Sequence, residues 1–175
     1  MRTEAGMTLI ELVIVVAVAA MMLVIVAAIS IPWLQREAMR SAVYDVQTYV
    51  QLAKIESVSR NRECRFVVNT STGDLRVFDG AGTDAATDTT DDILLYETTL
   101  PDNVTFTNPG VGAAVTLQDL GSGSYQLEFT SDGIVNAGAG EVMLQGGASF
   151  GRISVFAAGG VEVERWNGSA WNAGA

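Results

Sequence analysis

The sequence has no histidine, a single cysteine and only 10 Lys+Arg among 175 residues. Without histidine, the chain cannot carry a Ser-His-Asp or Cys-His catalytic arrangement, and it lacks the commonest ligand of transition metals. Because Cys64 is alone, no disulfide can form within the chain. Paired catalytic carboxylates and a Gly-rich phosphate loop between a strand and a helix are also missing. We therefore expect no enzyme and no cofactor.

Acidic residues outnumber basic ones mainly in the distal part of the chain. From Phe66 to the C-terminus there are three basic and fourteen acidic residues, whereas residues 35–65 hold six basic and four acidic ones. The formal net charge of the whole chain is -10. An acidic surface repels phosphate backbones, so nucleic acid is not expected as a partner.

One long apolar run lies near the N-terminus. Leu12 to Ile29 contains no charged residue, and Leu9, Ile10 and Ile31 extend the run. Since a bilayer core requires about 20 apolar residues of helix, the run predicts a single transmembrane helix. A secretory signal peptide cut near residues 27–30 is the alternative, although its apolar region is normally shorter, at about 7–15 residues.

Glu11 lies inside this apolar run. A carboxylate at membrane depth costs about 2.5–3.5 kcal/mol on insertion scales, so it requires either headgroup contact or a positive partner. The run itself contains no Lys or Arg. The one cation that could reach Glu11 is an amino terminus created by cutting the chain close to it.

The stretch Gly6-Met7-Thr8-Leu9-Ile10-Glu11-Leu12 resembles the processing motif of type IV prepilins and pseudopilins. The resemblance implies cleavage between Gly6 and Met7 by the prepilin peptidase, followed by N-methylation of Met7. It further implies that Glu11 neutralises the terminal amine of a neighbouring subunit during assembly. A buried amine and a buried carboxylate are each costly alone and tolerable together. The leader departs from the usual basic pattern because Glu4 accompanies Arg2.

The helix is expected to continue beyond the membrane. Pro32 should kink or interrupt it because proline has no N–H to donate. After Trp33, apolar residues recur at spacings of three and four, which predicts an amphipathic helix that ends near residues 59–61. The stripe consists of Met39, Ala42, Val43, Val46, Tyr49, Val50 and Ala53.

From Cys64 onward the pattern predicts short β-strands. They are expected at residues 65–68, 75–78, 93–96, 104–107, 115–117, 125–129, 142–144, 153–156 and 161–164. Tight turns are expected at residues 71–74 and 131–133, and Gly159-Gly160 fits a two-residue hairpin turn. The predicted class is α+β: a long transmembrane and amphipathic helix followed by a pilin-like domain of one or two antiparallel sheets.

The distal part is also similar to the GspH/FimT group of minor pseudopilins and minor pilins. The resemblance rests on the helix end at 52–58, the RFVVN stretch at 65–69, Phe78-Asp79, the segment 129–133 and a closing hairpin. It implies a leader at 1–6, a hydrophobic helix at 7–31, its amphipathic half at 32–62 and a periplasmic β domain at 63–175. The subunit would be anchored by one span in a bacterial inner membrane and incorporated into a filament.

The resemblance implies a structural subunit of a type II secretion pseudopilus as the first interpretation. The alternative is a minor pilin of a type IV pilus that serves adhesion, twitching or competence. Implied partners are other subunits, the prepilin peptidase and an inner-membrane assembly platform. An anchored β-domain binding module that never polymerises is the alternative from another class, and it predicts indifference to Glu11.

Two further hypotheses concern ligands. Some FimT-type proteins bind DNA through basic residues at the C-terminal hairpin, but here Glu162 and Glu164 occupy the corresponding stretch, so tight DNA binding is not predicted. The aspartate-rich loop is a weaker candidate for Ca2+, because carboxylate oxygens suit this ion. A solvated acidic loop is the favoured interpretation. The loop's aspartates are Asp79, Asp84, Asp88, Asp91 and Asp92.

Overall fold

The structure, a computed structural model, describes residues 9–80 and 93–173, without the side chains of residues 27–29 and 31–32. It divides into two compact units, Met1–Gln35 and Arg36–Ala175. The predicted processing residues Gly6 and Met7 lie outside the described residues. So do four of the five aspartates of the acidic loop, namely Asp84, Asp88, Asp91 and Asp92.

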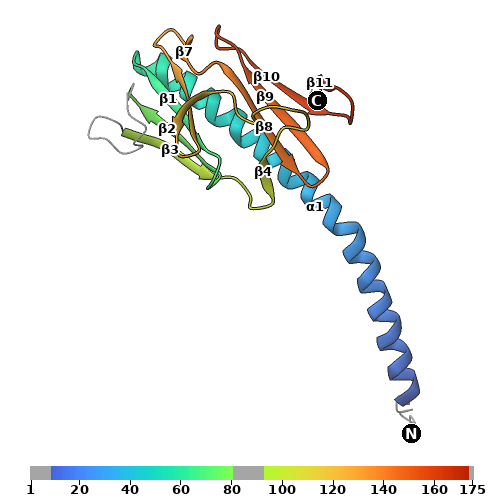
Figure 1. Ribbon diagram of the computed structural model, residues 1–175. Coiled ribbons are helices and arrows are strands. Elements are labelled where there is room, and N and C mark those ends of the chain that lie inside the picture. Colours follow the sequence, from blue (N-terminus) through green and yellow to red (C-terminus); the bar gives the residue numbers. More distant parts are fainter. Residues whose placement is uncertain (1–8, 81–92, 174–175) are drawn as a thin grey trace. The chain divides into compact units, whose positions relative to one another are not determined.

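One helix, α1 (Leu9–Arg60), contributes to both units (Figure 1). Its end at Arg60 agrees with the predicted end. Asn61 adopts a left-handed conformation with φ of 52°, and the Arg62 N–H donates to the Ser57 carbonyl at 3.1 Å, which caps the last turn. Pro32 does not end the helix, so of the predicted kink or interruption the interruption is wrong. Apolar helices tolerate a proline because its missing hydrogen bond is a local loss.

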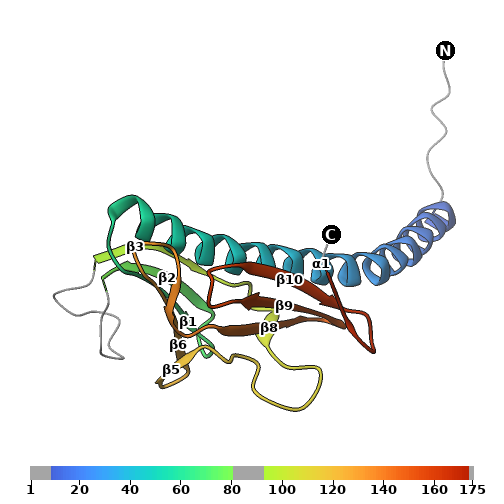
Figure 2. The same cartoon turned by 90° about the horizontal axis from the view of Figure 1, so that it is seen from above.

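The β part forms two antiparallel sheets (Figure 2). The first has the order β3-β2-β1-β6-β5, with β7 also paired to β6. The second has the order β11-β10-β9-β8-β4. These pairings confirm the α+β class. The strands of the first sheet are β1 (Cys64–Asn69), β2 (Asp74–Asp79), β3 (Ile93–Thr99), β5 (Gln118–Gly121), β6 (Ser124–Phe129) and β7 (Val135–Ala137). Those of the second are β4 (Val104–Phe106), β8 (Gly140–Gly146), β9 (Ser149–Val155), β10 (Val161–Trp166) and β11 (Trp171–Ala173).

Two local predictions about the strands are wrong. The expected strand at 115–117 is absent from the described sheets: Val115 makes only an isolated bridge to Val142, and β5 starts at Gln118. Val115 and Leu117 are buried in the core, so their apolar character reflects burial and not ladder pairing. The expected two-residue turn at Gly159-Gly160 is part of a longer connection, residues 156–160, because the Phe156 N–H bonds to the Gly160 carbonyl.

The core of the second unit lies between α1 and the inner faces of both sheets. The predicted stripe is confirmed: Met39, Ala42, Val46, Val50 and Ala53 are buried, and Val43 and Tyr49 pack partly buried against them. The strands contribute alternate residues, as in β1, where Phe66 stands opposite Val77 on one side and Leu127 on the other. This packing holds the two sheets against the same length of helix.

Candidate assembly surface

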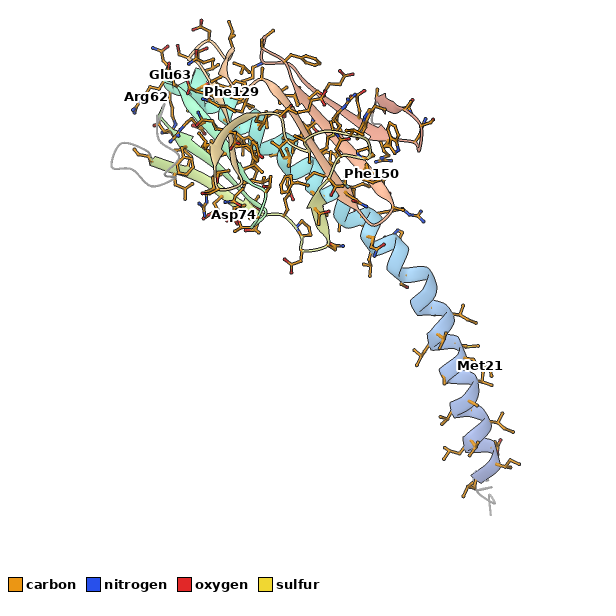
Figure 3. The ribbon with its side chains drawn as sticks, viewed as in Figure 1. Met21, Arg62, Glu63, Asp74, Phe129 and Phe150 are labelled. Atoms are coloured by element: carbon orange, nitrogen blue, oxygen red, sulfur yellow. The ribbon has the colours of Figure 1, made fainter. Side chains whose placement is uncertain are left out.

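The first unit presents an apolar helix with no protein cover. Residues Leu9–Val26 are long and apolar enough to cross a membrane by length and composition, and none of this window is buried. Large apolar side chains are exposed all around the helix, as Met21 illustrates in Figure 3. Because such a surface is unfavourable in water, it requires lipid or other helices around it.

Glu11 is the acidic residue in the first turn of α1. It is also the one charged residue between Leu9 and Val26. A negative charge in the first turn of a helix interacts favourably with the helix dipole, by about 0.3–1 kcal/mol at an exposed site. The structure thus places a carboxylate at the start of an otherwise apolar helix, where a cation brought by another molecule can approach it.

In the second unit, the side of α1 opposite the buried stripe remains exposed. Tyr44, Ile55 and Val58 are exposed there, together with the polar Thr48 and Gln51. These positions follow the helical spacing of three, four and seven residues, so they form one face. The same helix therefore binds its own β domain with one face and offers another face to neighbouring molecules.

Polar contacts fix the C-terminal end of α1 to both sheets. The Tyr96 hydroxyl of β3 donates to Glu56 at 2.8 Å, and the Arg60 guanidinium donates to the same carboxylate at 2.6 Å. The hydrogen bond from Arg60 has the largest part in lowering the pKa of Glu56, followed by the bond from Tyr96. The bond between Tyr96 and Glu56 also raises the pKa of Tyr96. Lys54 donates to the Gly159 carbonyl beside β10 at 2.8 Å. Sequence reasoning missed the contacts between α1 and the sheets because Tyr96 lies 40 positions from Glu56, and Gly159 lies 105 positions from Lys54.

Asp79 is the one member of the predicted Ca2+ loop that the structure describes. Its buried carboxylate lies 3.4 Å from the Arg60 guanidinium and 3.5 Å from that of Arg62, which is labelled in Figure 3. Two neighbouring positive charges oppose a cation at this carboxylate. Among the described residues, no group of three or more Cys, Asp or Glu side chains is placed to hold a metal ion.

Cys64 is buried at the start of β1. Burial raises the pKa of its thiol to about 11, so the thiolate is scarce at neutral pH. A cysteine in this state behaves as a small core residue and not as a nucleophile. Its position gives no support to covalent catalysis.

A half-open groove of about 970 Å³ lies between α1 and β10. Its lining includes the apolar Val43 and Val163 and charged residues of both signs, such as Arg40 and Glu162. On the outer side of β10, Glu164 accepts a hydrogen bond from Arg152 at 2.7 Å. The hairpin where basic residues would be required for DNA binding thus carries carboxylates.

The C-terminal aromatic residues pack on each other. Trp166 and Trp171 are opposite residues of β10 and β11, with ring centroids 5.3 Å apart, and the Arg152 guanidinium lies 4.7 Å from the Trp171 ring centre. Trp166 therefore packs against Trp171 across the β10–β11 pair.

Comparison with known protein families identifies a match. A family model described as type II transport protein GspH matches residues 42–159, which span the C-terminal part of α1 from Ala42 to Arg60, the whole first sheet, and β4, β8 and β9 of the second. No curated protein and no solved structure matches the chain.

Proposed function

The chain belongs to the GspH family of type II transport proteins, and we propose that it is a minor pseudopilin that assembles through α1 into the pseudopilus of a type II secretion system. The family is one of structural pseudopilins and not of enzymes. A single apolar helix near the N-terminus fits a single-pass inner-membrane subunit.

The observation that carries the proposal is the exposed apolar window Leu9–Val26 with one carboxylate in its first turn. The family match starts at residue 42, so this window supports the proposal independently of the match. A helix of this kind is stable in lipid, and it is equally stable when the apolar surfaces of other helices replace the lipid. The subunit can therefore pass from the membrane into a filament without a soluble intermediate.

In this account residues 1–6 are a leader that the prepilin peptidase removes between Gly6 and Met7. Met7 is then N-methylated, residues 7–31 form the filament-core helix, and residues 32–62 and 63–175 form the amphipathic half and the periplasmic domain. The inner-membrane assembly platform receives the subunit. Glu11 pairs with the amine of a neighbouring subunit, because each charge alone would be costly away from water.

Replacement of Glu11 tests this proposal. Glu11→Gln keeps the size of the side chain and removes its charge, so processing and membrane insertion should persist. Recovery of the subunit in sheared filaments should fall by at least about tenfold, since an uncompensated buried amine costs more than 1.4 kcal/mol. Immunoblots of the filament and membrane fractions measure the ratio.

Glu4→Gln provides the matched control, because it removes a carboxylate from the leader and not from the mature chain. This variant should enter filaments like the wild type. If Glu11→Gln enters filaments as well as Glu4→Gln does, the proposed role of Glu11 in assembly is wrong. If the wild type and Glu4→Gln are also absent from filaments, the anchored binding module that never polymerises becomes the better account.

A further inference from the structure

β3 is a border strand of the first sheet (Figures 1 and 2). It pairs with β2, and no other described strand lies on its far side. The Leu100 N–H donates to the Gly73 carbonyl at 2.9 Å, and hydrogen-bonded pairs alternate along an antiparallel ladder. Tyr96 and Thr98 therefore bond to β2, while Glu97 and Thr99 direct their N–H and C=O groups toward the free edge.

The side chains of β3 are exposed to an extent that β1, β2 and β6 do not show. Ile93 is 59% exposed, Leu94 46% and Tyr96 37%. Proteins usually protect an edge strand by shortness, proline or several charges. β3 has seven residues, no proline and one charged residue, Glu97. Exposed apolar residues on such an edge are typical of an interaction site.

The edge is held in place before any partner arrives. Tyr96 is bonded to Glu56 of α1, and Glu97 pairs with Arg76 of β2 at 2.6 Å. The Thr99 hydroxyl donates to Asp74 at 2.9 Å. Because these contacts order the strand in the free protein, a partner does not have to supply the ordering free energy.

The charge around this edge selects the partner. Asp91 and Asp92 directly precede β3 in the sequence, and Glu97 lies within it. The neighbouring Arg76 of β2 is already paired with Glu97 and Asp74. A second copy of the chain would bring the same net charge of -10 and would be repelled. An extended segment with Lys or Arg side chains would instead be attracted.

We propose that the free edge of β3 docks an extended, cationic segment of a different protein, which adds to the first sheet as a further strand. Main-chain hydrogen bonds to Glu97 and Thr99 supply the register, and Ile93 and Leu94 receive the apolar side chains. This site is separate from the assembly helix and does not depend on cleavage at Gly6. It gives the subunit a second, heterotypic contact.

A synthetic peptide in which valine and lysine alternate serves as the probe for the full-length protein in lipid nanodiscs. The peptide should bind, more weakly at high salt, and should slow hydrogen exchange of residues 93–100. A peptide that alternates valine and glutamate should not bind. Equal binding of the two peptides would overturn the charge argument and with it the proposal.

Two variants at Glu97 separate edge pairing from charge. Glu97→Pro and Glu97→Ala both lose the contact with Arg76, but only proline removes the outward N–H and obstructs the edge. We expect about a tenfold loss of affinity for Glu97→Pro relative to Glu97→Ala, which is about 1.4 kcal/mol. Equal affinities of two folded variants would contradict strand addition.

Ile93→Lys keeps the test decisive if Glu97→Pro does not fold. Ile93 is exposed, so the fold should tolerate lysine, which places a repulsive charge at the proposed site. Weaker peptide binding by Ile93→Lys than by Ile93→Thr supports the site. Unchanged binding places the peptide elsewhere and overturns the proposal.

Discussion

The Glu56 carboxylate connects α1 to β3 through its hydrogen bond with Tyr96. Its lowered pKa predicts how the stability of the fold depends on pH. Hydrogen bonds from Arg60 and Tyr96 hold the pKa of Glu56 below its usual value. A carboxylate with a lowered pKa in the folded state stabilises the fold above its unfolded pKa, and this stabilisation is lost as the pH falls through the folded pKa. The Glu56→Gln variant should therefore show a smaller fall in melting temperature between pH 7 and pH 3 than the wild type.

The same experiment has a built-in comparison. The pKa of Asp74 is also lowered, by hydrogen bonds from the Thr72 and Thr99 hydroxyls, so part of the acid sensitivity should persist in Glu56→Gln. Glu37→Gln, at an exposed helix position, should reproduce the wild-type profile. A Glu56→Gln profile identical to that of the wild type would mean that the contacts of Glu56 do not contribute to stability.

Single residues differ in how far the sequence reveals them. Glu11 is conspicuous in the sequence because it is a carboxylate in an apolar run. In the structure it lies in the first turn of α1. Glu56 and Tyr96 lie 40 positions apart, and nothing in either local sequence indicates their contact. Gly6 and Met7 remain predictions from sequence alone.

At the scale of elements, Gly151 sets the spacing between β9 and α1. A Cβ atom at this position would lie 2.7 Å from Cγ2 of Val43 and 2.9 Å from Cε of Met39. The methionine end can move, but the branched valine is stiff. Gly151→Ala should therefore destabilise the fold by about 1–3 kcal/mol, the usual cost of overpacking, as measured by denaturant unfolding.

Gly160→Ala, in the connection between β9 and β10, is the matched control. Its added Cβ would lie 3.6 Å from Cδ2 of Phe156, an ordinary van der Waals distance. This variant should unfold within about 0.5 kcal/mol of the wild type, as surface substitutions usually do. Equal stability of the two variants would show that the helix can retreat from β9 at little cost.

The elements that the sequence predicted well have strong periodic signals. α1 carries a long apolar run and then an apolar stripe, and its end at Arg60 lies within the predicted range of residues 59–61. β7 and β11 have three residues each with little apolar character (VNA and WNA), and they were missed, whereas the three-residue β4 (VTF) was predicted. The contact between Trp166 and Trp171 depends on the register of β10 against β11, which the sequence alone does not fix.

At the scale of the whole molecule, the excess of acidic residues argues against nucleic acid as a partner. The net charge is -10, and the β10 hairpin carries Glu162 and Glu164. We predict no duplex DNA binding below about 1 µM at physiological salt, because non-specific binding depends on Lys and Arg contacts to phosphates. A fluorescence anisotropy titration measures this, and submicromolar binding would contradict the prediction.

The central claim is that the molecule is a processed subunit whose apolar helix starts close to Glu11. Intact mass and N-terminal peptide mass spectrometry of the protein from its native membrane test this most directly. The account predicts a mature chain that begins with N-methylated Met7. A chain that begins at Met1, or near Ser30, would contradict it.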